Sequence, residues 1–114
     1  MINSLKPNQV FVFGSNTNGF HIGGAANQAM QWGAVYGIGA GRMGKTYAIP
    51  TLDTDFSKLP LETIQDHLLE LSEYASMHPN TEFLLTKLGQ GIAGFTSEEM
   101  ESIMPIFPDN VIKI

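Results

Sequence analysis

Two glycine-rich segments of this sequence follow directly after short apolar runs. Residues 14–24 follow the apolar run 10–13 and lead into an alanine-rich stretch, and residues 89–95 follow residues 83–86 and lead into a helix-start signal. Glycines let several backbone N–H groups converge on one point, so a strand, a glycine loop and a helix in this order commonly form an anion site in α/β proteins. Two such loops in 114 residues predict one anionic ligand that is held from two sides.

Polar and aromatic side chains in these loops extend the predicted binding site. Asn16 lies just past the first apolar run, where its amide could hydrogen-bond ribose hydroxyls or stabilise the turn. Phe95 could stack on a base or ribose, or pack into the core. The predicted binding residues are Gly14, Ser15, Asn16, Gly23, Gly24, Ala25, Gly89, Gln90, Gly91, Ile92, Ala93, Gly94 and Phe95.

Three side chains near the loops are candidates for catalysis. If the ligand is hydrolysed, its phosphate would align a bound water, Asn16 would orient the ribose, and His21 or Asp53 would assist proton transfer. His21 could instead contact a diphosphate or be an exposed loop histidine, and Asp53 could bind an adenine amine or be a turn residue. Lys87, at the mouth of the second glycine loop, could neutralise a phosphate, attack C1 of a ribose or remain solvated. Ser15 lacks the G-x-S-x-G elbow, so we do not expect a catalytic serine.

A third glycine-rich segment, residues 39–46, matches the P-loop pattern G-x-x-x-x-G-K-T. A P-loop needs a buried strand before it and a helix after it, because the loop amides and the helix N-terminus cradle the phosphates together. Here residues 34–38 are interrupted by glycine, and residues 47–50 are strand-like and end at a proline. We therefore predict that the match is a coincidence, although Arg42 or Lys45 could still face an anion.

Composition favours one compact domain over residues 1–114. The chain is 43% hydrophobic and 15% charged, contains no cysteine and has no apolar run close to the roughly 18 residues of a membrane span. A net charge of −5, with only six Lys and Arg, disfavours nonspecific nucleic-acid binding. His67 and His78 lack metal-ligand spacing, so we predict no metal and no cofactor. The start of the sequence lacks the apolar core of a signal peptide, and we expect a cytoplasmic protein.

The residue pattern alternates strands with helices. Strands are predicted at about 9–13, 46–51, 83–86 and 110–114, and helices at 24–32, 60–77 and 96–104, the last beginning with a capping box at Thr96. Residues 33–46 should form a loop or a broken short strand. The first turn of the helix at 24–32 carries no acid, which leaves its positive end free for a phosphate. This order predicts an α/β fold with a mostly parallel or mixed sheet between layers of helices.

The two glycine loops also resemble those of the macro domain, an α/β fold that binds ADP-ribose. The resemblance lies in a strand leading to Asn16, in Gly23-Gly24-Ala25-Ala26 at a helix start, and in residues 91–95, which are similar to the family's G-I-hydrophobic-G-aromatic diphosphate loop. From about residue 10 to 107 the chain resembles short bacterial and phage proteins with the pattern G-S-N, G-x-H, G-G-A-A, Y-A-I-P-T, G-x-G-I-A-G. The family's double asparagine is reduced here to Ser15-Asn16, and the chain is shorter than typical macro domains.

By this resemblance, Asn16 would face the distal ribose, both loops would hold the diphosphate, and Phe95 would flank the ribose or base. The resemblance implies a single three-layer macro-domain-like fold and binding of ADP-ribose or a related nucleotide diphosphate, free or attached to a macromolecule. Hydrolytic removal of ADP-ribose is the enzymatic form of this hypothesis. Two alternatives stay open, an interaction module with no nucleotide ligand and a P-loop nucleotide-binding protein.

Overall fold

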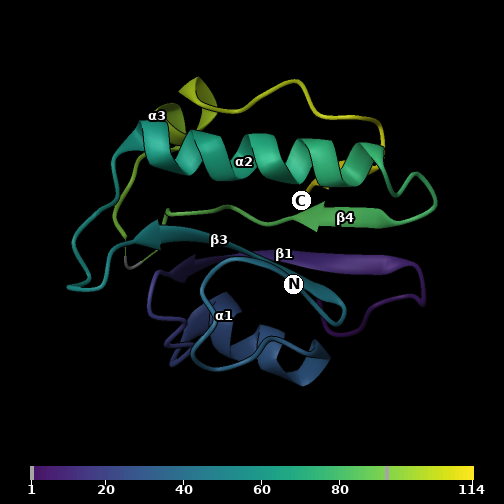
Figure 1. Cartoon of the computed structure of the whole chain (residues 1–114), viewed down its shortest axis with the longest axis horizontal. Coiled ribbons are helices and arrows are strands. Elements are labelled where there is room, and N and C mark those ends of the chain that lie inside the picture. Colours follow the sequence, from purple (N-terminus) through teal and green to yellow (C-terminus); the bar gives the residue numbers. More distant parts are fainter. Residues whose placement is uncertain (1, 92) are drawn as a thin grey trace.

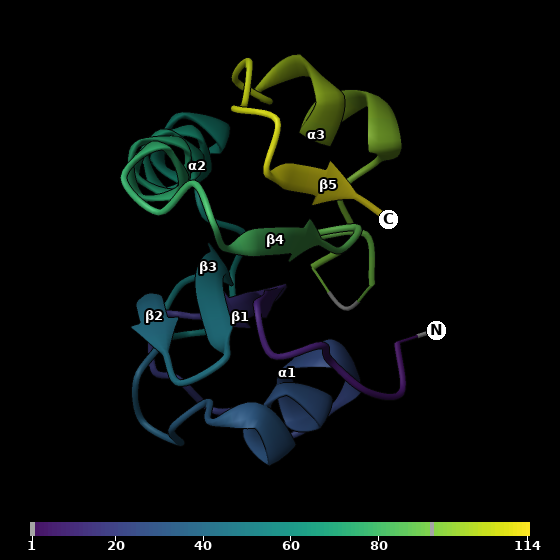
Figure 2. The same cartoon turned by 90° about the vertical axis from the view of Figure 1, so that its right-hand side faces the viewer.

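The computed structural model describes residues 2–91 and 93–114 as a three-layer α/β fold. A five-stranded sheet lies between α2 and α3 on one face and α1 on the other (Figures 1 and 2). The strand order is β2-β3-β1-β4-β5, and all neighbours are parallel except the antiparallel pair β2 and β3. The strands are β1 (Gln9–Asn16), β2 (Gly41–Met43), β3 (Thr46–Leu52), β4 (Glu82–Leu85) and β5 (Val111–Lys113), and the helices are α1 (Gly24–Ala29), a 3₁₀ turn (Met30–Trp32), α2 (Leu61–Ser76) and α3 (Ser97–Ser102). The predicted α/β fold with a mixed sheet is confirmed.

The central strand β1 is buried on both faces, as its unbroken apolar run predicts. Val10 and Val12 pack with the buried side of α2, whereas Phe11 and Phe13 pack with Ala29 of α1. Successive side chains of a strand point to opposite faces, so one strand supplies both halves of the core.

The helices follow the expected pattern closely. The buried residues of α2 are Ile64, Leu68, Leu71 and Ala75, the members of its 3- and 4-residue repeat. In α3 the Thr96 hydroxyl accepts from the Glu99 N–H at 3.0 Å while the Glu99 carboxylate accepts from the Thr96 N–H at 2.9 Å, the predicted capping box. The hydrogen bond from the Thr96 backbone lowers the pKa of Glu99. No helix in the described part of the chain is long and apolar enough to cross a membrane.

The glycine-rich stretch between α1 and β3 forms a short antiparallel strand. β2 pairs with β3 through Gly41↔Ala48 and Met43↔Thr46, so residues 41–48 form a β-hairpin. The expectation of a broken short strand within 33–46 was therefore correct. The hairpin places β2 at the edge of the sheet, beside the first residues of β3.

The connections around β1 create a crevice at one end of the sheet. Strands β1, β3 and β4 run in the same direction, so their carboxyl ends meet at one edge (Figure 1). The chain leaves β1 toward α1 on one face, but it leaves β3 and β4 toward α2 and α3 on the other. Ligands of open α/β sheets bind in crevices outside the carboxyl ends of such strands, where the chain switches faces.

Candidate functional site

A cavity of about 390 Å³ lies at the carboxyl ends of β1, β3 and β4. It brings together the two glycine-rich segments that the sequence predicted as one site. The predicted binding residues that line it are Gly14, Ser15, Asn16, Gly23, Gly24, Ala25, Gly89, Gly91 and Ala93. Of the other predicted residues, Gln90, Gly94 and Phe95 are absent from the cavity wall, and Ile92 lies outside the described residues.

One wall of the cavity is the backbone of the loop after β4. The N–H of Phe95 donates to the carbonyl of Gly89 at 2.8 Å, and the N–H of Gly94 donates to that of Gly91 at 3.0 Å, which closes the loop on itself. Gly89 and Gly94 have φ near +70°, a left-handed conformation that favours glycine. A Cβ added to Gly91 would meet nothing within 4 Å. The backbone at Gly91 is therefore open to a ligand.

The facing wall is the start of α1. Gly23 is its N-cap residue, no side chain caps the helix, and the first turn contains no acid. The first N–H groups of a helix have no carbonyl partner within the helix. In α1 the first N–H with such a partner is that of Asn27, which donates to the carbonyl of Gly23 at 3.2 Å. A Cβ on Gly23 or Gly24 would meet open space. Small residues thus leave this backbone exposed to the cavity from the opposite side.

Asn16 lines the cavity, but its amide is mostly engaged in holding the following turn. Its Oδ1 accepts from the N–H of Phe20 at 2.9 Å, and its Nδ2 donates to the carbonyl of Phe20 at 3.0 Å. One N–H of the amide remains for a ligand. The neighbouring Ser15 hydroxyl donates to the carbonyl of Gly39. The turn-stabilising alternative for Asn16 is therefore correct, and a ribose contact would depend on its second N–H.

His21 is placed differently from a proton-transfer group, a diphosphate contact or an exposed loop residue. Its side chain is fully buried, its ring lies edge-on to Phe13 at 5.3 Å, and its Nε2 lies 3.0 Å from the carbonyl of Ile38. Because His21 lines neither the cavity nor the surface, the expectation that it transfers a proton to a ligand is corrected. It fastens the loop after β1 to the loop that precedes β2.

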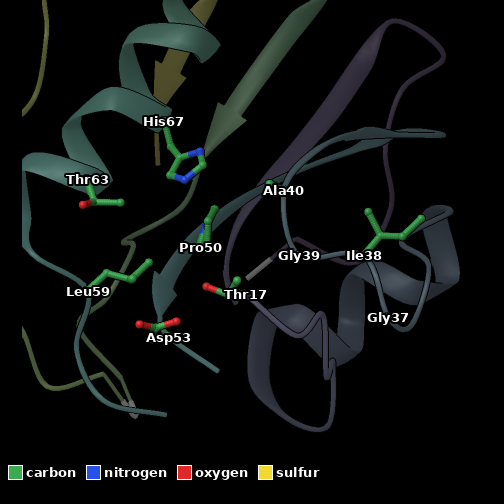
Figure 3. A pocket seen from close by; sticks show the side chains of 10 residues that line it. All are labelled: Thr17, Gly37, Ile38, Gly39, Ala40, Pro50, Asp53, Leu59, Thr63 and His67. Carbon is green, nitrogen blue, oxygen red and sulfur yellow. The ribbon is translucent and has the colours of Figure 1, made fainter. Parts of the chain in front are cut away.

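Asp53 lies outside the cavity as well. It lines a separate hollow of about 560 Å³ together with Thr17, Pro50 and His67 (Figure 3). Its carboxylate accepts from the N–H of Thr54 at 2.7 Å, so it is the turn residue of the alternative interpretation. This corrects its assignment as a catalytic residue at the glycine loops. Of Asn16, His21 and Asp53, the structure brings only Asn16 to the cavity.

Phe95 belongs to the core, which corrects the expectation that it flanks a base or ribose. Its side chain is buried against Met100 and the other residues under α3, with the Lys58 Nζ 4.9 Å from the ring centre on its outer side. The absence of a Cβ at Gly89 allows this packing, because a Cβ there would lie 3.0 Å from the Phe95 ring. The glycine-rich loop therefore uses its aromatic residue as an anchor.

The cavity contains aromatic side chains that sequence reasoning missed. Phe20 and Phe56 line it, each in a polar loop directly after a strand. Neither residue belongs to a helical or strand-like repeat of apolar residues, so hydrophobic periodicity does not identify them. The available signal is a large aromatic residue in a polar loop: Phe20 follows Gly19, and Phe56 follows Asp53-Thr54-Asp55. A large apolar residue in such a polar loop has no helix or strand face to bury it.

The segment that matches the P-loop pattern runs along the edge of the sheet, from Gly39 beside Asn16 and Thr17 to Lys45 at the amino end of β3. Its Lys45 precedes β3, and the ammonium group donates to the carbonyl of Lys6 at 2.9 Å. A strand follows it in place of a helix, so its amides have no helix N-terminus to act with. The strand that the sequence predicts after this segment, in place of the helix of a P-loop, is confirmed.

Comparison with known proteins supports the fold and leaves the function open. No protein-family model matches the chain, and no curated protein matches it. A solved structure described as a protein of unknown function from Bacteroides thetaiotaomicron is similar over 98% of this chain and 91% of that one, with a TM-score of 0.63 and 14% sequence identity. At this identity the similarity shows a shared α/β fold alone.

Proposed function

We propose that this protein binds ADP-ribose or a related nucleotide diphosphate in the cavity at the carboxyl ends of β1, β3 and β4. The observation that carries the proposal is the meeting of two separate glycine-rich backbones across one cavity, with Gly23 and Gly24 on one side and Gly89 and Gly91 on the other. Backbone N–H groups without competing side chains are well suited to the oxygens of a diphosphate.

The charge around the cavity supports the same ligand. The chain contains 11 Asp and Glu and has a net charge of −5, yet none of those acids lines the described wall of the cavity. Lys87, directly after β4, is the one ionisable side chain of that wall. An acidic protein that keeps its acids away from one cavity leaves that cavity favourable for an anion.

We propose recognition rather than turnover as the activity of this site. Hydrolysis needs a group that holds or moves a proton at the reacting atoms, but His21 is buried elsewhere and Asp53 lines the other hollow. A macromolecule that carries ADP-ribose would fit the same proposal as a partner. The check is an assay for ADP-ribose released from a modified protein, and release at rates that scale with protein concentration would show turnover.

Titration calorimetry with ADP-ribose, NAD and ATP tests the binding proposal. We expect heat from ADP-ribose with the wild type and a loss of at least about 100-fold in affinity in Gly91→Glu, because the new carboxylate would occupy the open space over the loop. Gln90→Glu is the matched control, since it adds the same charge one residue earlier on a side chain outside the cavity wall. The proposal fails if none of the three nucleotides binds the wild type, or if both variants bind ADP-ribose as it does.

A further inference from the structure

We infer that Phe20 and Phe56 form a stacking site for the planar nucleobase of the ligand, at the end of the cavity away from Lys87. The inference rests on the proposed function for the ligand's class and adds a specificity element that the glycine loops cannot supply. Backbone amides recognise phosphate oxygens but do not distinguish one base from another, or a nucleotide from free diphosphate.

The two rings are accessible and close to each other. Their centres lie 6.2 Å apart at an interplanar angle of 40°, and Phe20 and Phe56 are 37% and 47% exposed. Tyr36 stacks on Phe20 with centres 5.4 Å apart and planes inclined by only 14°. Tyr36 therefore covers one face of Phe20, and the two phenylalanines present aromatic surface to the cavity that they line. Rings in this arrangement accept a further planar ring by offset stacking.

The backbone of Phe56 gives an independent reason to assign its ring a function. Phe56 has φ of +64° and, among the described residues other than glycine, it alone has a positive φ. A bulky side chain disfavours this conformation, whereas glycine adopts it readily. The turn is imposed locally, because the Phe56 N–H donates to the carbonyl of Asp53 at 2.9 Å and Asp55 accepts from the Ser57 N–H at 3.0 Å. Phenylalanine at this position strains the backbone without burying its ring in the core.

The order of the strands separates the two rings from the glycine loop after β4, where the phosphates of the proposed ligand would bind. Phe56 follows β3, Phe20 follows β1, and Lys87 with Gly89 follows β4. Along the edge of the sheet the order is β3-β1-β4, so the rings lie over one side of β1 and the glycine loop over the other. Neighbouring strands are about 4.8 Å apart, so the two ends are separated by roughly two strand spacings, about 10 Å. A nucleoside diphosphate is an elongated molecule of this size with a ring at one end and charge at the other.

A second copy of this chain is the competing occupant of these exposed rings. We favour the nucleobase because the two rings line a cavity whose opposite end is polar and lacks acids. An apolar protein surface seated on the rings would leave that polar end without a binding partner. A flat interface between two copies would not require the strained turn at Phe56, because an unstrained backbone can also present an exposed apolar ring.

The test follows the ring protons of Phe20 and Phe56 by NMR during separate titrations with adenosine, inorganic diphosphate and ADP-ribose. Adenosine carries the base without phosphate, and diphosphate the charge without a base. We expect upfield shifts of the phenylalanine ring protons with adenosine and ADP-ribose, and shifts of the Gly91 amide with diphosphate and ADP-ribose. Phe56→Gly should keep or raise the midpoint of thermal unfolding, because glycine relieves the strained turn, and should weaken ADP-ribose binding by about tenfold or more. Its affinity for diphosphate should stay unchanged.

Ile106→Gly provides the control, because Ile106 is 99% exposed and does not line the cavity. If diphosphate and ADP-ribose fail to bind while adenosine still shifts the rings and Phe56→Gly removes that shift, the stacking site stands and the proposed diphosphate function falls. If adenosine shifts neither ring, or if folded Phe56→Gly binds ADP-ribose like the wild type, the inference is wrong. It is also wrong if Phe56→Gly changes only the sedimentation of the protein, which would identify the rings as an interface between copies.

Discussion

Two glycine-rich segments of this chain, residues 39–46 and 89–95, both match the pattern of phosphate loops, but Gly39 and Gly44 of the first and Gly91 of the second have opposite surroundings. In the first segment glycine allows backbones to touch. A Cβ on Gly39 would overlap the carbonyl oxygen of Asn16 and lie 2.8 Å from that of Thr17, and a Cβ on Gly44 would lie 2.9 Å from the carbonyl oxygen of Trp32. In the second segment a Cβ on Gly91 would meet open space. Gly39 and Gly44 thus allow close backbone packing, whereas Gly91 leaves space free.

The difference follows from where each segment stands relative to a parallel strand. Residues 41–46 lead through a hairpin into the amino end of β3, with Gly39 packed against the backbone of Asn16 and Thr17, whereas residues 89–95 follow β4 at its carboxyl end. The carboxyl ends border the crevice between α1 and the other helices. Gly89, Gly91 and Ala93 line the cavity there, whereas none of residues 39–46 does. A matching motif is therefore weaker support for a phosphate site than the position of a glycine loop after a parallel strand.

The largest effect that separates the two segments concerns alanine substitutions. We expect Gly39→Ala to lower the free energy of unfolding by about 3 kcal/mol, because its backbone neighbours cannot move away from a new methyl group. Gly91→Ala should leave that free energy within about 0.5 kcal/mol of the wild type and should weaken ADP-ribose binding instead. Urea unfolding followed by circular dichroism, with calorimetry on the same samples, measures both. Equal stability of the two variants would refute the distinction.

Most of the sheet and the longest helix could be predicted from the sequence, because their signals are local. The apolar run of β1, the repeat of α2 and the capping box at Thr96 each depend on residues within a few positions of one another. The position of the cavity was also predictable, since parallel strands bring the loops after them to one edge. β2 carries little strand signal of its own and exists because Gly41 and Met43 pair with β3.

The side chains around the cavity were harder to predict, because their environment depends on distant segments. The sequence indicates a loop histidine at position 21, but in the structure His21 is covered by residues of a different loop, with its ring beside Tyr36 and its Nε2 near the carbonyl of Ile38. Phe95 appears free to stack on a ligand until α3 brings Met100 beneath the loop. Phe20 and Phe56 are 36 positions apart in sequence, and only the pairing of β1 with β3 makes them neighbours. Sequence spacing gives no measure of such contacts.

A smaller effect should show that the P-loop-like segment leads into the core. Tyr47, directly after Thr46, is 6% exposed, and burial, followed by the charges of Glu70 and Tyr74, raises its pKa from 10.0 to about 12. Between pH 10 and 12 the unfolded tyrosine has lost its proton and the folded one retains it, so the free energy of unfolding falls as the pH rises. The expected loss is about 2 kcal/mol in total.

The check is urea unfolding at pH 9, 10, 11 and 12 for the wild type and for Tyr47→Phe, which lacks the titrating hydroxyl. Other lysines and tyrosines titrate in both proteins, so the difference between the two curves reports Tyr47. Parallel curves across this range would mean that Tyr47 meets solvent in the folded protein and that the start of β3 is not part of the core.

The smallest expected effect compares the lysines of the two segments. Lys87→Gln should weaken ADP-ribose binding by roughly threefold to tenfold, because a single exposed cation contributes on the order of 1 kcal/mol to an ion pair. Lys45→Gln should leave the affinity unchanged, since the Lys45 ammonium contacts the carbonyls of Leu5 and Lys6 at the other end of the sheet. Calorimetry at 50 and 300 mM salt sharpens the contrast, because the affinity of Lys87→Gln should depend less on salt than that of the wild type. A greater loss in Lys45→Gln than in Lys87→Gln would move the phosphate site to the hairpin and reverse the comparison on which the proposed function depends.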